Sequence, residues 1–285
     1  MEGMASISNN EIKRVKSLQQ KKFRDESGLF IVEGQKMVDE AMKSSYKIEA
    51  VYYRDEIGEE AMKRITSLSS PSPVLAVVRK PDDAYLHDIS VKTGEISKGG
   101  LYLGLDSIRD PGNLGTILRI ADWFGINAVF ATMDTVDVFN PKVVQATMGA
   151  VFRVKMHYVD LPELSKIALS LGGKVYGTFL DGKNIYAQEL ENKGVIVMGN
   201  EGNGISANIE KWIDKKLFIP NYPIGTETTE SLNVAIATSI DALAVGISLA
   251  MAGDVNIFLA AFVTACVIFL ALWPLFRKMK EDRRG

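Results

Sequence analysis

Cysteine and histidine are nearly absent from this chain of 285 residues, which has one cysteine and two histidines. The single cysteine, Cys266, excludes an internal disulfide and any zinc site built on a cysteine cluster. His87 and His157 lie too far apart in the sequence to suggest a metal site, and both are expected to be structural or surface residues. The composition therefore does not indicate metal chemistry or disulfide stabilisation.

The chain also lacks a strong net charge and an apolar N-terminal segment. Its formal net charge is −2, so no overall basic field attracts nucleic acid. Residues 1–17 contain no signal-peptide core, which predicts a cytoplasmic enzyme. Positive charge is concentrated in residues 11–24, EIKRVKSLQQKKFR. This segment predicts a helix that either contacts nucleic-acid phosphates or is a solvated surface helix.

Strand and helix patterns alternate along most of the chain. In the first part, strands are predicted at 29–34, 48–55 and 73–81. Residues 81–100 have no clear periodicity, end in two glycines and are predicted to link two domains. In the second part, strands are predicted at 101–106, 128–132, 174–181, 194–199 and 216–221. This order predicts an α/β fold with a mostly parallel sheet, which binds ligands beyond the carboxyl ends of its strands.

Three polar loops follow predicted strands of the second part. The first leads into RDPGNLGTILRIA, residues 109–121, where DPGN predicts a turn before a helix. Gly112 and Gly115 would let the backbone approach a ligand closely. Arg119 follows Asn113 by only a few residues, so the two are expected to converge.

The second loop is GNEGNGIS, residues 199–206. Its glycine spacing differs from the dinucleotide fingerprint, and Glu201 would repel a pyrophosphate. Backbone groups of this loop are instead expected to bind a neutral or cationic ligand. In the third loop, within residues 218–237, Ser231 begins a helix and Asn233 lies beside it.

The order RDPGNLGTILRIA, VMGNEGNGIS and IP…ESLNVAIA resembles the SpoU, or TrmH-type, branch of the SPOUT RNA methyltransferases. Residues 21–41, KKFRDESGLFIVEGQKMVDEA, are similar to the RNA-binding domain that often precedes the catalytic domain in that family. The resemblance covers residues 8–240. It implies a trefoil-knotted, mostly parallel α/β catalytic domain at 101–240 that works as a homodimer. A small α/β RNA-binding domain at 1–80 and a linker at 81–100 would precede it.

The resemblance also implies S-adenosylmethionine as methyl donor and a ribose 2′-hydroxyl of RNA as acceptor, with rRNA favoured over tRNA. The positions matching the family's active site are Asn113, Arg119, Glu201, Ser231 and Asn233. Those matching its cofactor site are Thr178, Gly199, Asn200, Gly202, Ile219 and Leu232. These motifs contain no histidine or cysteine, so Arg119 would bind the RNA phosphate and stabilise the developing alkoxide. The family is also described with this arginine as general base, and Glu201 would orient it or balance its charge.

The chain departs from the family pattern after residue 240. Residues 257–276 contain no charge and are long enough to span a bilayer, and ATSIDALAVGISLA, residues 237–250, resembles a transmembrane helix of small bacterial manganese efflux pumps. Three interpretations of the apolar helical segment 241–285 stay open. It is a membrane hairpin that associates the enzyme with a membrane through residues 242–276, a fusion of two reading frames, or a helix on the domain or dimer.

Two other functions compete with RNA methylation. The first is a non-catalytic RNA-binding relative, and the presence of Asn113, Arg119 and Glu201 argues against it. The second is a fragment of a membrane metal transporter. Paired acidic residues across several apolar spans, which metal transport needs, are missing from the sequence.

Overall fold

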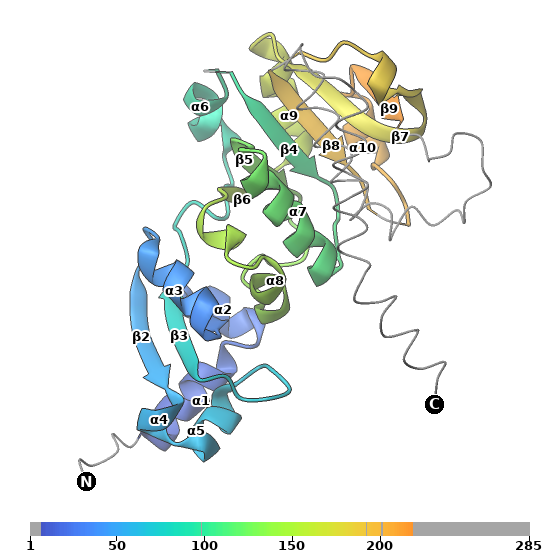
Figure 1. Cartoon of the computed structure of the whole chain (residues 1–285). Coiled ribbons are helices and arrows are strands. Elements are labelled where there is room, and N and C mark those ends of the chain that lie inside the picture. The colour runs from blue at the N-terminus through green and yellow to red at the C-terminus, as the bar shows by residue number, and fades with distance from the viewer. Residues whose placement is uncertain (1–6, 98, 192, 201, 219–285) are drawn as a thin grey trace, which may run out of the picture.

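The computed structural model describes residues 7–97, 99–191, 193–200 and 202–218, which are coloured in Figure 1. Several predicted site residues lie outside the described residues: Glu201, Ile219, Ser231, Leu232 and Asn233. The apolar segment 241–285 lies outside them as well. In the part of the chain that the structure describes, no helix is both long and apolar enough to cross a bilayer. The three interpretations of the C-terminal segment therefore stay predictions.

Residues 7–80, here called the N-terminal domain, contain a three-stranded antiparallel sheet in the order β1-β3-β2. The strands are β1 (Leu29–Glu33), β2 (Ile48–Tyr53) and β3 (Val74–Arg79). The helices are α1 (Asn9–Ser17), α2 (Lys21–Ser27), α3 (Gln35–Lys43), α4 (Arg54–Ile57) and α5 (Glu59–Ile65). β1 is buried along its whole length, which explains the apolar run from Leu29 to Val32, and its last residue, Glu33, is a buried carboxylate.

The second sheet has six strands in the order β6-β5-β4-β8-β7-β9, and every pairing in it is parallel. Its strands are β4 (Leu101–Leu105), β5 (Ala128–Ala131), β6 (Met156–Tyr158), β7 (Lys174–Asn184), β8 (Gly194–Met198) and β9 (Lys215–Phe218). The predicted parallel α/β sheet is confirmed. β6 was not predicted, because three residues are too short to show a strand pattern. The part of the chain from residue 81 to 218 is here called the parallel-sheet domain.

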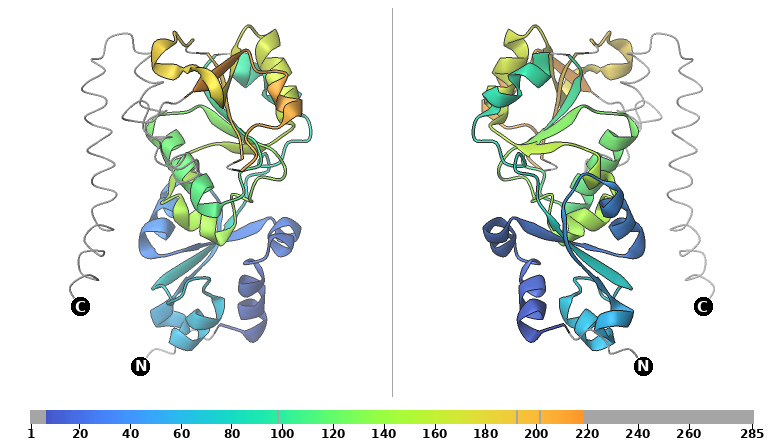
Figure 2. Two further views of the ribbon diagram at one scale, coloured as in Figure 1. Left: turned by 90° about the vertical axis from the view of Figure 1, so that its right-hand side faces the viewer. Right: turned by 90° about the vertical axis from the view of Figure 1, so that its left-hand side faces the viewer.

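Helices cover both faces of this sheet (Figures 1 and 2). On one face, α7 (Pro111–Trp123) and α8 (Pro141–Ala146) pack with the short helix η2 (Ala150–Phe152). On the other face lie α6 (Thr93–Ser97), α9 (Leu161–Ser170) and α10 (Ala207–Glu210). Alternate strand residues point to opposite faces. Leu103 of β4 accordingly joins the core under α7, whereas its neighbour Tyr102 joins the core under α9.

The predicted linker, residues 81–100, is packed against the parallel sheet. The Leu86 N–H donates to the Tyr158 carbonyl at 2.9 Å, and the Tyr158 N–H donates to the Ala84 carbonyl at 2.8 Å. Ile89, in η1 (Ile89–Lys92), and Ile96, in α6, are buried in the core under α9. The segment therefore forms part of the parallel-sheet domain's packing, and the exact domain boundaries stay a prediction.

The sequence DPGN is the first turn of α7 rather than a separate turn. The Asp110 carboxylate caps the helix by accepting from the Asn113 N–H at 2.8 Å, and Pro111 occupies the first helical position. Gly115 is buried where α7 crosses α8. A Cβ at Gly115 would lie 2.3 Å from the Cβ of Ala146. The expectation that Gly115 opens the backbone to a ligand is therefore wrong, because its missing side chain lets two helices touch.

The substitution Gly115→Ala is expected to lower the free energy of unfolding by about 1–3 kcal/mol, because the added methyl group overpacks the contact with Ala146. Urea unfolding followed by circular dichroism measures this loss. The double variant Gly115→Ala with Ala146→Gly should recover part of it by removing the opposing methyl group. A double variant less stable than both single variants would contradict the steric explanation.

Candidate active site

α7 presents Asn113 and Arg119 from its first and third turns. Leu114, Ile117 and Leu118 of this helix are buried, whereas Arg119 is exposed and Asn113 is half-buried. Residues six apart on an α-helix lie about 9 Å apart along the axis and about 120° apart around it. The structure thus places both residues on one helix, and the expected convergence of their side chains stays a prediction.

The loop after β8 closes on itself between Asn200 and Gly204. The Asn200 N–H donates to the Gly204 carbonyl at 3.0 Å, and the Gly204 N–H donates back at 2.9 Å. The Asn200 Oδ1 accepts from the Gly202 N–H at 2.9 Å and from the Asn203 N–H at 3.2 Å. The Asn200 side chain therefore organises the loop, a role that the sequence motif does not reveal.

Asn200 also joins this loop to the segment that leads into α7. Its Nδ2 donates to the Ser107 carbonyl at 2.8 Å. Gly199 allows the loop to fold so tightly, because a Cβ there would lie 2.2 Å from the carbonyl carbon of Gly204. The first two predicted loops are thus physically connected at the carboxyl edge of the sheet.

Thr178 lies near the same edge. β7 pairs with β8 at Gly177 and Val197, and it pairs with β9 at Thr178 and Leu217. Thr178 of β7 therefore lies beside the end of β8, where Gly199 begins its loop. Of the predicted cofactor residues, the structure places Thr178 on β7, and it places Gly199, Asn200 and Gly202 in the loop that follows the neighbouring strand β8.

The described part of this site is uncharged, since it offers a threonine hydroxyl, an asparagine amide and glycine backbone groups. Such groups can form hydrogen bonds with the adenine and ribose of an adenosyl group without repelling a cationic sulfonium. Within residues 7–218, as far as they are described, no cluster of His, Cys, Asp and Glu could hold a metal ion. The donor set therefore fits S-adenosylmethionine.

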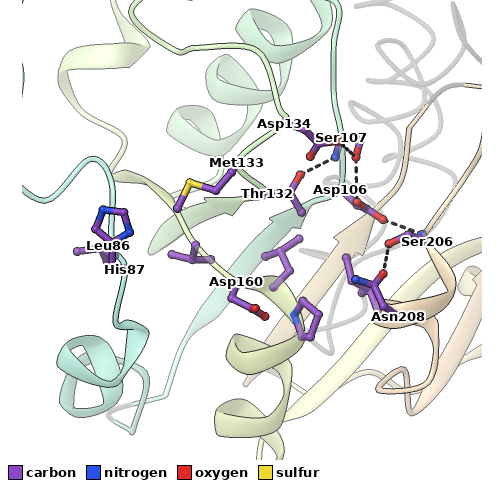
Figure 3. Close-up of a pocket in the computed structure, with 14 residues that line it drawn as sticks. Leu86, His87, Asp106, Ser107, Thr132, Met133, Asp134, Asp160, Ser206 and Asn208 are labelled. Carbon is purple, nitrogen blue, oxygen red and sulfur yellow. Dashed lines mark hydrogen bonds between the residues drawn. The ribbon is translucent and has the colours of Figure 1, made fainter. Parts of the chain in front are cut away.

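A separate pocket of about 480 Å³ lies beyond β4, β5 and β6, beside the start of α9 (Figure 3). The Asp106 Oδ2 accepts from the Ser206 N–H at 2.7 Å, and Asp160 caps α9. Hydrogen bonds from Ser107 and Thr132 lower the pKa of Asp134. These carboxylates make the pocket unfavourable for an RNA phosphate. None of the predicted site residues lines it.

The two histidines have the structural and surface positions expected of them. His157 is 2% exposed, and its Nδ1 lies 2.6 Å from the Asp83 carbonyl oxygen. His87 is exposed and lines the pocket that contains Asp106, Asp134 and Asp160, here called the acidic pocket. Neither contacts the loop after β8 through a hydrogen bond that the structure records.

The basic segment 11–24 forms two helices instead of one continuous basic face. Arg14 pairs with Glu11 at 2.6 Å, and Lys21 pairs with Asp25 at 2.5 Å. Arg24 is only 1% exposed. The segment therefore offers fewer cations to a nucleic acid than its composition suggests. Tyr52 and Tyr53, which follow this segment in the N-terminal domain, belong to strand β2.

Comparisons with known proteins agree with these motifs. The SpoU rRNA methylase family matches residues 100–242, and the MRM3-like substrate binding domain matches residues 9–84. The 23S rRNA (guanosine(2553)-2′-O)-methyltransferase RlmP of Bacillus subtilis is 30% identical over 256 residues, which cover 84% of this chain and 97% of that protein.

Two solved structures share the architecture. A TrmH-family RNA methyltransferase from Porphyromonas gingivalis has a TM-score of 0.71 and 34% identity, covering 83% of this chain and 97% of that one. An AdoMet-bound rRNA methyltransferase from Sinorhizobium meliloti has a TM-score of 0.70 and 26% identity, covering 84% of this chain and 95% of that one.

The fold is that of a SPOUT catalytic domain preceded by a small domain with an antiparallel sheet. The chain belongs to the SpoU rRNA methylase family, and it is an S-adenosylmethionine-dependent RNA 2′-O-ribose methyltransferase. Residues 214–275 also match a family of manganese efflux pumps. This second match overlaps the first at residues 214–242, where the described structure continues only to Phe218.

Proposed function

We propose that this enzyme methylates a ribose 2′-hydroxyl in ribosomal RNA and that Arg119 is its central catalytic residue. The main support is structural: Arg119 is exposed on α7, and the segment before this helix is bound by Asn200 to the loop after β8. The names of RlmP and of the Sinorhizobium meliloti enzyme specify rRNA as their substrate. A domain similar to the MRM3-like substrate binding domain also favours a large RNA.

The substrate class can be tested with labelled methyl donor and three RNA preparations, namely transcripts of large-subunit rRNA, small-subunit rRNA and a tRNA pool. The proposal expects incorporation into one rRNA at about one methyl group per molecule. Equal or greater incorporation into tRNA would contradict the choice of rRNA while leaving the enzyme class intact.

Thr178, Gly199, Asn200 and Gly202, together with Ile219 and Leu232, would hold S-adenosylmethionine. When bound, this cofactor supplies an electrophilic methyl group on a sulfonium. The protein then has to place a ribose hydroxyl in line with that methyl group, and such positioning contributes a large share of methyl-transfer catalysis. A rigid loop closed by Asn200 serves this purpose, because its backbone groups need not reorganise.

Arginine side chains are cationic and only donate hydrogen bonds, so we assign Arg119 to the RNA phosphate and to the negative charge that develops on the ribose oxygen. Glu201 would orient this guanidinium through a charge-assisted hydrogen bond. Asn113, Ser231 and Asn233 would fix the acceptor hydroxyl or the surrounding loops. A ribose hydroxyl loses its proton as the new oxygen–carbon bond forms, and because no histidine occurs in these motifs to accept it, we assign this proton to solvent water.

We further propose that the enzyme is a trefoil-knotted homodimer and that α7 contributes to its interface. Trp123 lies four residues after Arg119, on the same side of α7, and its side chain is 85% exposed. Large aromatic residues often supply much of the binding energy at protein interfaces.

The substitution Trp123→Ala is therefore expected to weaken self-association by about 30-fold or more. Sedimentation velocity over a concentration series measures the dimer dissociation constant. Met133→Ala provides the control, because Met133 is also exposed but lies at the acidic pocket. A dimer that is equally stable in the Trp123 and Met133 variants would contradict this interface.

A further inference from the structure

The N-terminal domain and the parallel-sheet domain share one apolar core. Phe30 of β1 belongs to the same buried cluster as Phe139 and Phe152 of the parallel-sheet domain. The Phe30 and Phe139 ring centroids are 4.8 Å apart, and those of Tyr46 and Phe152 are 5.3 Å apart. The Tyr46 hydroxyl donates to the Val151 carbonyl at 3.1 Å. An apolar core of this kind holds the two domains together, but it does not by itself fix the angle between them, because apolar burial is non-directional.

A buried ion pair crosses the same junction. Arg24, at the middle of α2, is 1% exposed, and Asp137, on the loop between β5 and α8, is 5% exposed. The Arg24 Nε and Nη2 donate to the Asp137 Oδ2 at 2.9 Å and 2.6 Å. The Arg24 Nη1 donates to the carbonyls of Leu18 and Gln19, both at 2.9 Å. One guanidinium therefore connects the end of α1 to the parallel-sheet domain.

Asp137 is itself held in a single orientation. Its Oδ1 accepts from the Phe139 N–H at 3.0 Å and from the Tyr85 hydroxyl at 3.2 Å. The Tyr85 ring stacks on Tyr158 of β6 with centroids 4.7 Å apart. The carboxylate thus cannot turn to follow a displaced arginine without breaking these contacts. Apolar packing has no preferred direction, whereas the planar guanidinium of an arginine forms its hydrogen bonds only in certain orientations.

A second ionic connection reaches α7. Arg153 pairs with Glu40 of α3 in the N-terminal domain and with Asp122 of α7, the latter at 2.8 Å. The hydrogen bonds that Arg153 donates to the Asp122 and Glu40 carboxylates raise its pKa. Asp122 follows Arg119 by less than one helical turn. The orientation of the N-terminal domain is therefore transmitted to the helix that carries the proposed catalytic arginine.

We propose that Arg24 is a positioning residue, which fixes the N-terminal domain at one angle to α7 so that RNA held by this domain reaches Arg119 in register. The N-terminal domain is then a rigid extension of the catalytic domain rather than a hinged module. The part of this inference that concerns RNA rests on the proposed function, whereas the fixed angle rests on the contacts alone.

The kinetic test uses the full chain with the paired substitutions Arg24→Gln and Asp137→Asn. Removing both charges avoids leaving one buried ion unpaired, and asparagine keeps the Oδ1 acceptor for the Phe139 N–H. We expect S-adenosylhomocysteine affinity within about twofold of wild type, KM for rRNA raised about tenfold, and kcat/KM lowered about 100-fold.

Met62→Ala is the matched control, because Met62 is fully buried in the N-terminal domain but belongs to the separate cluster between the sheet and α1. It should destabilise this domain without changing the angle between the domains. The two variants would be compared under conditions in which they are equally far below their melting temperatures. An equal loss of kcat/KM in the Met62→Ala control would overturn the positioning role of Arg24.

The angle itself is measured by pulsed electron–electron double resonance. Spin labels would be placed through Glu56→Cys on α4 and Glu163→Cys on α9, both at exposed positions, in a Cys266→Ser background. We expect one narrow distance distribution that rRNA does not shift, and a broad one after the paired substitutions. The proposal of a rigid angle would be overturned by a broad distance distribution, or by one that rRNA shifts, in the labelled chain that keeps Arg24 and Asp137. If the wild-type chain methylated no RNA, the proposed function would fail, but the distance measurement would still decide whether the angle is fixed.

Discussion

Replacing Arg119 with alanine is expected to reduce methyl transfer about 1,000-fold or more, because the transition state loses its main source of positive charge. Cofactor affinity should stay within a few-fold, since Arg119 projects from α7 and not from the strand ends that would hold S-adenosylmethionine. Single-turnover methylation measures the first effect, and calorimetry with S-adenosylhomocysteine measures the second.

Arg109→Ala is the matched control for this experiment. Arg109 is also an exposed arginine, it lies on the loop just before α7, and its Nη2 lies 3.9 Å from the Asp134 Oδ2. Its replacement should change methyl transfer less than about tenfold, the order expected for one surface cation near a nucleic acid. Loss of cofactor binding in the Arg119 variant, or equal losses of activity in both variants, would refute the role assigned to Arg119.

Replacing Gly199 with alanine is expected to weaken cofactor binding by about 10- to 100-fold. The added methyl group would lie 2.2 Å from the Gly204 carbonyl carbon and 2.3 Å from the Ile205 nitrogen, so backbone has to move. Overpacking against backbone costs about 1–3 kcal/mol, and each 1.4 kcal/mol lost from binding is a tenfold loss of affinity. Calorimetry with S-adenosylhomocysteine tests this directly.

Gly115→Ala serves as the comparison for the Gly199 variant. It also adds one methyl group to a closed contact, but between α7 and α8 instead of in the loop after β8. It should lower stability while leaving cofactor affinity nearly unchanged. If both variants lost cofactor affinity to the same degree, the effect would come from general destabilisation and not from the loop.

Short-range patterns predicted much of the fold, and they named two loops that the structure connects at the carboxyl edge of the parallel sheet. Strand and helix periodicity gave the parallel sheet, and the motifs identified Asn113 and Arg119, which share α7. Contacts between distant residues were not predictable in this way. The basic run around Arg24 looked solvent-exposed, because its partner Asp137 lies 113 residues further along the chain.

Two glycines illustrate the same limit. Gly115 and Gly199 both belong to motifs that suggest close approach of a ligand, yet Gly115 contacts another helix and Gly199 contacts its own loop. The sequence shows that a side chain is absent at these positions. It does not show which neighbour occupies the space, since that depends on how the elements pack.

The interpretation of the C-terminal segment, residues 241–285, stays open. The SpoU and efflux-pump matches overlap over residues 214–242, which agrees with the idea of two joined sequences as well as with an added apolar extension. Cytoplasmic location and membrane association through residues 242–276 stay predictions. Separating membranes from cytosol by flotation, with and without residues 241–285, would test the membrane association.

The most direct test of the enzyme's function is the chemical identity of the methylated product. The full chain, in mild detergent, would be incubated with labelled S-adenosylmethionine and rRNA transcripts, and the RNA digested to nucleosides for mass spectrometry. The account predicts a 2′-O-methylated nucleoside at a single position, formed by the wild-type chain and absent with the Arg119→Ala variant. A methyl group on a base, or no transfer by a chain that binds S-adenosylhomocysteine with micromolar affinity, would contradict it.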